Sequence, residues 1–269
     1  METKEKIKSE ISKRFTRDLL ASALGRAYVL TQAAVAEGSD ESAVFDRLLP
    51  VVDDPQLQKA IATHKADEER HAKMFEACVQ RQGVAPITIP ASHQLLPLIR
   101  EEMGGFDAPN MERTSARWVA GPIKTHEDIM NTYLVLQVIE ERAIEQFTIL
   151  HDVIGEFDPE SAAVIAQIMA DEERHLKYCA AITKRYAPSP AALEAGLRTY
   201  RDAEARAFRK QQQLTGQTLL AMPVMPKYKR WVWRAVLDAL RPLTEKVLPY
   251  TRAGLRAQVM ARSASPIPA

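Results

Sequence analysis

The chain has 269 residues, a net charge of +1 and 46% hydrophobic residues, which is enough for one large domain or two small ones with a sizeable core. Its two cysteines, Cys78 and Cys179, exclude a disulfide framework and form no CxxC pair, which favours a reducing compartment. The first ten residues are charged and no long apolar run occurs, so we expect neither a secretory signal nor a membrane-spanning helix. We therefore expect a cytoplasmic protein.

The first half of the chain predicts two helical segments. Residues 15–49 repeat apolar side chains at alternating three- and four-residue steps, typical of one helical stripe, and Gly38 marks a bulge or break within it. The stretch DDP at 53–55 combines an N-terminal Asp with a first-turn Pro and predicts a second helix that ends near Gly83.

The next 100 residues repeat this plan. Prolines and a Gly-Gly pair in residues 84–124 predict a long connection with one short helix. A third helix is predicted over 126–154 and a fourth over 159–186, after a second Asp-Pro start. Two helical hairpins joined by one long crossover are the ferritin-like connection. We predict an all-α fold in which residues 1–187 form a ferritin-like four-helix bundle with a dimetal site.

Residues 188–269 differ in charge from the bundle. Up to residue 184 the chain has 21 Lys and Arg against 30 Asp and Glu, whereas from residue 185 it has 15 against 5. We predict a basic helical C-terminal extension with a separate role. Its segment KYKRWVWR at 227–234 favours a helix docked on the bundle or in a homodimer interface; peripheral membrane contact comes second, and nucleic acid is disfavoured.

The octapeptide ADEERHAK at 66–73 returns as ADEERHLK at 170–177, one copy on the second helix of each hairpin. Each copy contains Glu-x-x-His, formed by Glu68 with His71 and by Glu172 with His175. Residues three apart share one face of a helix, so each carboxylate and imidazole project together. Two such pairs in one bundle core predict four metal ligands.

A two-metal carboxylate site also needs a glutamate from each of the other two helices. Glu140 is the acidic residue on an otherwise apolar stripe, whereas Glu141 and Glu145 are expected to be solvated. Glu37 stands 31 residues before Glu68 and is preferred to its rival Glu41, one turn further on.

The predicted ligand set therefore comprises four carboxylates and two imidazoles, namely Glu37, Glu68, His71, Glu140, Glu172 and His175. Four carboxylates neutralise two divalent ions, and oxygen and nitrogen donors without thiolate suit iron or manganese. We expect two Fe ions, with Mn or a mixed Fe/Mn pair left open. We interpret His64 as a solvated or outer histidine and Tyr178 as an ordinary core residue.

These motifs resemble the ferritin-like di-iron carboxylate superfamily over residues 15–187. The DExxH form is similar to arylamine N-oxygenases, and IEERAIEQF at 139–147 resembles the corresponding helix of tRNA isopentenyladenosine hydroxylases. The resemblance implies that Asp67 orients His175 and that Asp171 orients His71. Helix A departs from the pattern, because VAEGSDESA lacks the usual Glu-x-x-Ala-x-x-x-Tyr arrangement.

The leading functional hypothesis is a di-iron oxidase or oxygenase that uses O2, a small organic substrate and an external electron donor. A second hypothesis is a ferroxidase or a peroxide-reducing protein of ferritin or rubrerythrin type. A third is a non-enzymatic metal-stabilised scaffold with a membrane- or protein-binding tail. The missing CxxC pairs disfavour a rubrerythrin with its rubredoxin module.

Overall fold

The computed structural model describes residues 2–38, 41–103 and 123–245. All regular structure in these residues is helical and none of it is strand, which confirms the all-α prediction. The elements are α1 (Glu2–Leu20), α2 (Ala23–Glu37), α3 (Glu41–Leu48), α4 (Pro55–Arg81), η1 (Ala91–His93), α5 (Leu95–Glu102), α7 (His126–Ile154), α8 (Pro159–Tyr186), α9 (Pro190–Ala221) and α10 (Lys227–Glu245).

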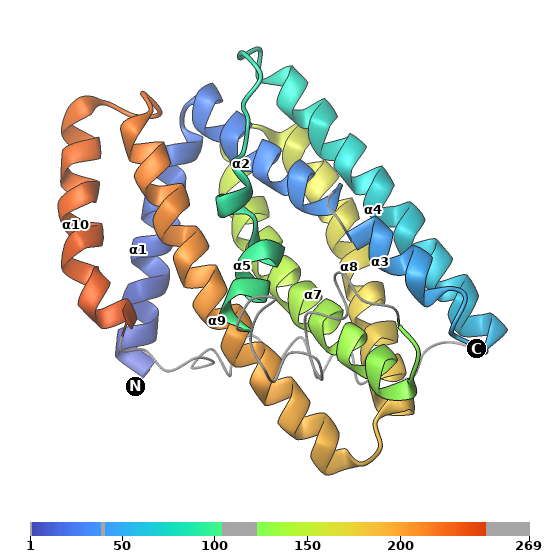
Figure 1. The fold of residues 1–269 in the computed structure, drawn as a ribbon. Helices are drawn as coiled ribbons and strands as arrows, with labels where there is room; N and C mark the ends of the chain where they lie inside the picture. Colours follow the sequence, from blue (N-terminus) through green and yellow to red (C-terminus); the bar gives the residue numbers. More distant parts are fainter. Residues whose placement is uncertain (1, 39–40, 104–122, 246–269) are drawn as a thin grey trace.

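Two long hairpins form the centre of the molecule (Figure 1). Helix α2 packs on α4, helix α7 packs on α8, and α4 and α8 meet between the two hairpins. Each second helix begins as predicted, with an Asp that accepts hydrogen bonds from the first turn followed by a Pro: Asp54 before α4 and Asp158 before α8. The predicted helices over 126–154 and 159–186 are confirmed to the residue.

The prediction of one helical segment over residues 15–49 is wrong, because the chain forms three helices there. Helix α1 ends at Leu20, and α2 leaves it at a bend of 112°. Ser22 caps α2 by accepting a hydrogen bond from the Gly25 backbone N–H, and this cap is the local reason for the break. The second break, after Gly38, lies where the sequence suggested one.

Helix α9 covers α7 and α5, and this packing overturns two expectations about α7. Glu141 and Glu145 are buried and not solvated. Arg201 of α9 lies 2.6 Å from Glu141, and Arg142 bridges Glu145 to Glu204 of α9. Glu141 therefore tolerates burial through a partner on α9, and Glu145 through the neighbouring Arg142, which Glu204 of α9 holds in place. The boundary at residue 187 stays a prediction.

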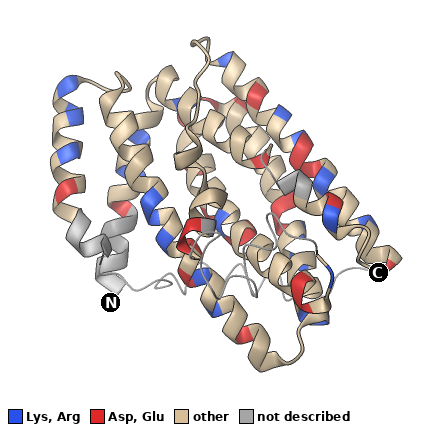
Figure 2. Ribbon diagram, viewed as in Figure 1, with Lys and Arg blue, Asp and Glu red and all other residues tan. Residues whose placement is uncertain are grey.

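Helix α10 packs beside α1, and basic side chains recur along α9 and α10 (Figures 1 and 2). The Trp233 ring meets Phe15 edge-on at 5.1 Å, and its indole N–H donates to Asp18 at 2.8 Å. Trp231 and Tyr228 remain exposed. One face of the 227–234 segment is thus docked on the protein, as expected. The contribution of residues 246–269 to the predicted tail lies outside the described residues.

No single helix in the described ranges is both long enough and apolar enough to cross a membrane. The bent pair Glu10–Leu20 and Ala23–Glu37 meets the criteria of length and composition only when its two parts are taken together.

The α1–α2 bend yields a test of the fold. A Cβ on Gly25 would lie 2.0 Å from the Leu19 carbonyl oxygen, whereas one on Gly155 would meet only ordinary contacts of 3.4 Å and 3.5 Å. We expect Gly25→Ala to lower the free energy of unfolding by about 3 kcal/mol or more, because backbone must move. Gly155→Ala should change it by less than about 1 kcal/mol. Equal effects of the two substitutions in denaturant unfolding would contradict this account of the bend.

Candidate metal centre

The six predicted ligands converge in the interior between the two hairpins. Helix α2 supplies one, α4 two, α7 one and α8 two. Their exposed fractions are 6% for Glu37, 3% for Glu68, 0% for His71, 3% for Glu140, 1% for Glu172 and 1% for His175. Four carboxylates buried this deeply in one place require compensation by positive charge.

Glu37 is the last residue of α2, where Gly38 caps the helix and its N–H bonds to the Ala34 carbonyl. Its Oε2 lies 3.1 Å from His71 Nδ1, so the structure brings Glu37 to the cluster. Its rival Glu41 begins α3, and its side chain lies outside the described residues.

The ligand atoms fall into two groups, and within each group every atom lies within 4.8 Å of the others. One group joins His64, Glu68, Glu140 and His175, and the other joins Glu37, Glu68, His71 and Glu172. Glu68 belongs to both. A carboxylate has two oxygens, so a shared glutamate can bridge two metal ions.

His64 is the functional candidate that the sequence reasoning missed. It is fully buried, and its Nε2 lies 2.9 Å from Glu68 Oε1 and 3.0 Å from Glu140 Oε1. Its burial excludes the solvated alternative, and of the outer alternative the structure shows that His64 lies as close to Glu68 and Glu140 as a ligand would. The sequence did contain a signal for this position. His64 precedes Glu68 by four residues, so the two side chains share one face of the helix. The duplication concealed it, since the corresponding residue of α8 is Ile168.

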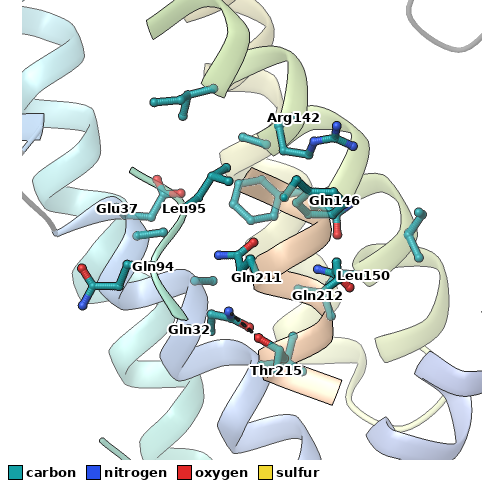
Figure 3. A pocket seen from close by; sticks show the side chains of 18 of the residues that line it. Gln32, Glu37, Gln94, Leu95, Arg142, Gln146, Leu150, Gln211, Gln212 and Thr215 are labelled. Atoms are coloured by element: carbon teal, nitrogen blue, oxygen red, sulfur yellow. Dashed lines mark hydrogen bonds between the residues drawn. The ribbon is translucent and has the colours of Figure 1, made fainter. Parts of the chain in front are cut away.

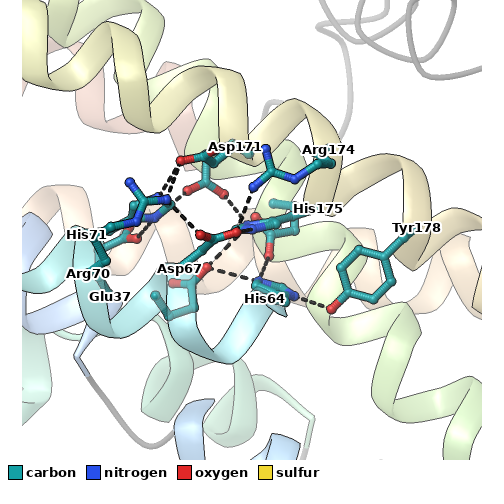
Figure 4. Close-up of polar contacts among 12 residues, drawn as sticks. Glu37, His64, Asp67, Arg70, His71, Asp171, Arg174, His175 and Tyr178 are labelled. Carbon is teal, nitrogen blue, oxygen red and sulfur yellow. Dashed lines mark hydrogen bonds and ion pairs between the residues drawn. The ribbon is translucent and has the colours of Figure 1, made fainter. Parts of the chain in front are cut away.

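The two repeat histidines are held crosswise by the aspartates of the opposite octapeptide (Figure 4). His71 Nε2 lies 3.2 Å from Asp171, and His175 Nε2 lies 3.2 Å from Asp67. In both rings Nδ1 faces the glutamates. An N–H donated outward to a carboxylate fixes the tautomer and leaves the inner nitrogen as a metal donor.

Two arginines pair with both of these aspartates on the outer side of the site. Arg70 lies 2.7 Å from Asp67 and 2.6 Å from Asp171, and Arg174 lies 2.6 Å from each of the same two carboxylates. Both guanidinium groups are roughly half exposed. The arginines neutralise the aspartates, which leaves the glutamate charge to be balanced from inside.

His64 has its own outer partner. Its Nδ1 is hydrogen-bonded to the Tyr178 hydroxyl, while its Nε2 faces Glu68 and Glu140 (Figure 4). Tyr178 is therefore more than a core residue, since it fixes the orientation of the third imidazole. The Tyr178 ring in turn meets Tyr133 edge-on at 5.9 Å.

Two inward-facing ligand atoms make no well-formed hydrogen bond in the described part of the chain, namely Glu172 Oε1 and His175 Nδ1. Their near neighbours are other candidate ligands, since Glu172 Oε1 lies 3.2 Å from His71 Nδ1 and His175 Nδ1 lies 3.3 Å from Glu68 Oε1. An unpartnered polar atom in a protein interior is rare and costs about 1–3 kcal/mol. Both atoms belong to the predicted donor set, and both are donor types that iron and manganese accept. The residues present therefore fit a two-ion site.

Charge repulsion sets the protonation states of the cluster. Burial, reinforced by the neighbouring Glu172 carboxylate, raises the pKa of Glu140 well above its ordinary value. Burial also acts to raise the pKa of Glu172, but hydrogen bonds with Glu140, His175 and His71 outweigh it and hold that pKa well below its usual range. For His71, burial acts to lower the pKa, yet hydrogen bonds to Glu172 and Glu37 raise it to about 10. With protein charges alone, His71 keeps its proton at neutral pH, and Glu140 binds a proton more readily than an exposed glutamate does.

A cavity of about 260 Å³ opens beside this cluster (Figure 3). It reaches the carboxylates of the metal-ligand candidates at one end and α1 at the other, with further walls from α2, α5, α7 and α9. The small side chains of Ala33 and Ala143 both line it. The volume is slightly below the usual range for pockets that hold drug-sized ligands.

No protein-family model, curated protein or solved structure matches this chain. The ferritin-like resemblance thus rests on the motifs of the sequence alone.

Metal binding at this cluster should release protons. A cation displaces the protons on Glu140 and His71, so affinity should fall as the pH is lowered from about 8 to about 6. Calorimetric titration with Mn²⁺ in buffers of different ionisation enthalpy measures the number released. Glu140→Gln should release fewer protons, and the exposed-site control Glu69→Gln should match the unsubstituted protein. Metal binding without proton release would contradict these protonation states.

Proposed function

We propose that this chain is a ferritin-like non-haem di-iron oxidase or oxygenase that uses O2 to oxidise a small organic substrate. The observation that carries the proposal is the pair of ligand-atom groups that share Glu68 and border a cavity. Iron is preferred to manganese on the proposed chemistry, and a mixed Fe/Mn pair offers the same donor fit.

In this proposal one ion is held by Glu37, His71 and Glu172, the other by Glu140, His175 and His64, with Glu68 shared. When bound, the two metals would supply the electrons that reduce O2. The chain's own groups do the positioning, because Asp67 and Asp171 fix the inner nitrogens of His175 and His71.

The cavity favours oxidation of an organic molecule over the ferroxidase alternative. A protein that only oxidises iron needs a path for ions, which calls for polar walls. Here the lining beside the glutamates includes Ala33, Ala143 and Phe147. Ferroxidase or peroxide-reducing activity and a non-enzymatic scaffold remain the outcomes that the experiments below separate from the proposal.

Metal analysis with O2 uptake tests the proposal. Anaerobic loading of the purified protein should give two iron ions per chain, followed by O2 consumption that depends on an external reductant. Glu68→Ala should lose most of both ions because Glu68 belongs to both groups. Glu69→Ala, one position along α4 and exposed, should retain both.

The outcomes discriminate among the three functions. Absence of bound transition metal would overturn both the oxygenase and the ferroxidase readings and leave the scaffold. Oxidation of Fe²⁺ by O2 without oxidation of any organic compound added to the protein would favour the ferroxidase function. Full iron content in Glu68→Ala would contradict the ligand set itself.

His64 should hold one ion and not the other. We expect His64→Ala to lower the affinity for the ion in the group that contains Glu140 by about tenfold or more. The affinity for the ion beside His71 should change by less than about threefold. Two-step metal titration followed by optical spectroscopy separates the two affinities. His126→Ala removes an exposed histidine and serves as the control. Unchanged binding of both ions in His64→Ala would contradict a ligand role.

A further inference from the structure

The cavity beside the carboxylates has small apolar side chains near the glutamates and amide side chains further from them. Close to the glutamates its walls include Ala33, Ala36 and Ala143. Ala143 lies one turn from Glu140, and Ala33 one turn from Glu37. Small apolar side chains at this depth leave space next to the ligands without offering a hydrogen bond.

Further from the glutamates the lining becomes rich in amides (Figure 3). The side-chain nitrogens of Gln32 and Gln211 both donate to the main-chain carbonyl of His93, at 3.3 Å and 3.0 Å. Because that carbonyl can only accept, both amide orientations are fixed. Gln32 also donates to Thr215 at 3.1 Å.

The fixed nitrogens leave the amide oxygens of Gln32 and Gln211 as acceptors in the cavity lining. Neither oxygen has a hydrogen-bond partner in the described part of the chain, and Gln211 is only 9% exposed. A ligand that carries an O–H or N–H group can satisfy them. Along α2, Gln32 stands five residues before Glu37, which places this acceptor roughly 8 Å from the carboxylates along the helix axis.

The cavity offers no free positive charge to an anionic ligand. Arg142 is the cation among the described lining residues. Its guanidinium makes two hydrogen bonds to Glu204, at 2.6 Å and 2.9 Å, and a third to Glu145. The ring of Phe208 lies 4.0 Å from the guanidinium carbon. A carboxylate ligand would therefore lose its hydration without gaining an ion-pair partner.

From these features we propose that the cavity binds a neutral, mainly apolar organic molecule with one hydroxyl or amide N–H. This group donates to the Gln211 oxygen, and the apolar part extends toward the glutamates. That this ligand is the substrate rests on the proposed oxidase or oxygenase function. The binding preference itself does not depend on metal.

Three probes of similar size test this specificity. Octan-1-ol has the donor, its isomer heptyl methyl ether lacks the donor, and octanoate carries a charge. Calorimetry on the purified full-length protein, with its metal content measured on the same sample, should show one octan-1-ol bound per chain. Octan-1-ol should bind about fivefold more tightly than the ether, the worth of one hydrogen bond, and at least about tenfold more tightly than octanoate.

Substitutions locate the acceptor. Gln211→Leu should bring the alcohol-to-ether affinity ratio close to one, while Gln213→Leu, two positions along on the exposed side of α9, should leave it unchanged. Ala143→Phe should abolish binding of both probes by filling the space beside the glutamates. Octanoate that binds the unsubstituted protein as tightly as octan-1-ol would overturn the proposal. An unchanged alcohol-to-ether affinity ratio in Gln211→Leu would also overturn it.

The same samples separate this inference from the proposed function. Selective binding of octan-1-ol to a protein that takes up no iron would leave the cavity assignment standing and overturn the oxidase or oxygenase. Two bound irons with O2 uptake, but no discrimination among the three probes, would overturn the specificity and leave the function.

Discussion

Burial of four glutamates between two helical hairpins is the constraint on which the rest of this structure depends. Glu37, Glu68, Glu140 and Glu172 are each at most 6% exposed and come from four different helices. Uncompensated, their charges would separate the helices or force protons onto them. The protein meets part of this demand with His71 and His175, whose pKa values the neighbouring carboxylates raise, and two divalent cations would supply the remainder.

The outer ring of charges is matched to this interior. Asp67 and Asp171 each face a histidine of the opposite repeat, and each is paired with Arg70 and Arg174. The repeated octapeptide thus forms a crossed network in which every copy supports the other. This arrangement accounts for the identity of the two copies in Asp, Glu, Arg and His, because each residue type has a contact to make across α4 and α8.

Helix α9 gives the centre its asymmetry. It packs on α7 and forms ion pairs with Glu141 and Arg142 of that helix. Its residues Gln211 and Thr215 line the cavity. The duplicated hairpins alone would leave these α7 charges facing water. The segment after Tyr186 therefore contributes one wall of the cavity, which its basic composition did not indicate.

Local signals in the sequence were sufficient for the helix starts at Asp54 and Asp158 and for the two Glu-x-x-His pairs, because capping and i,i+3 spacing are short-range. They failed where the deciding partner is distant. Glu141 is buried because Arg201 reaches it from α9. His64 has no counterpart in the second repeat, so an argument built on duplication passed over it. The break before Ala23 depends on the Ser22 cap, which an apolar stripe does not reveal.

Anomalous X-ray scattering from crystals grown with Fe²⁺ under anaerobic conditions tests the central claim most directly. The account predicts two iron peaks about 4 Å apart, on either side of the Glu68 carboxylate, one beside His71 and the other beside His64 and His175. Diffraction data that show the four glutamates in place with no peak between them would contradict it. So would iron bound only outside this cluster.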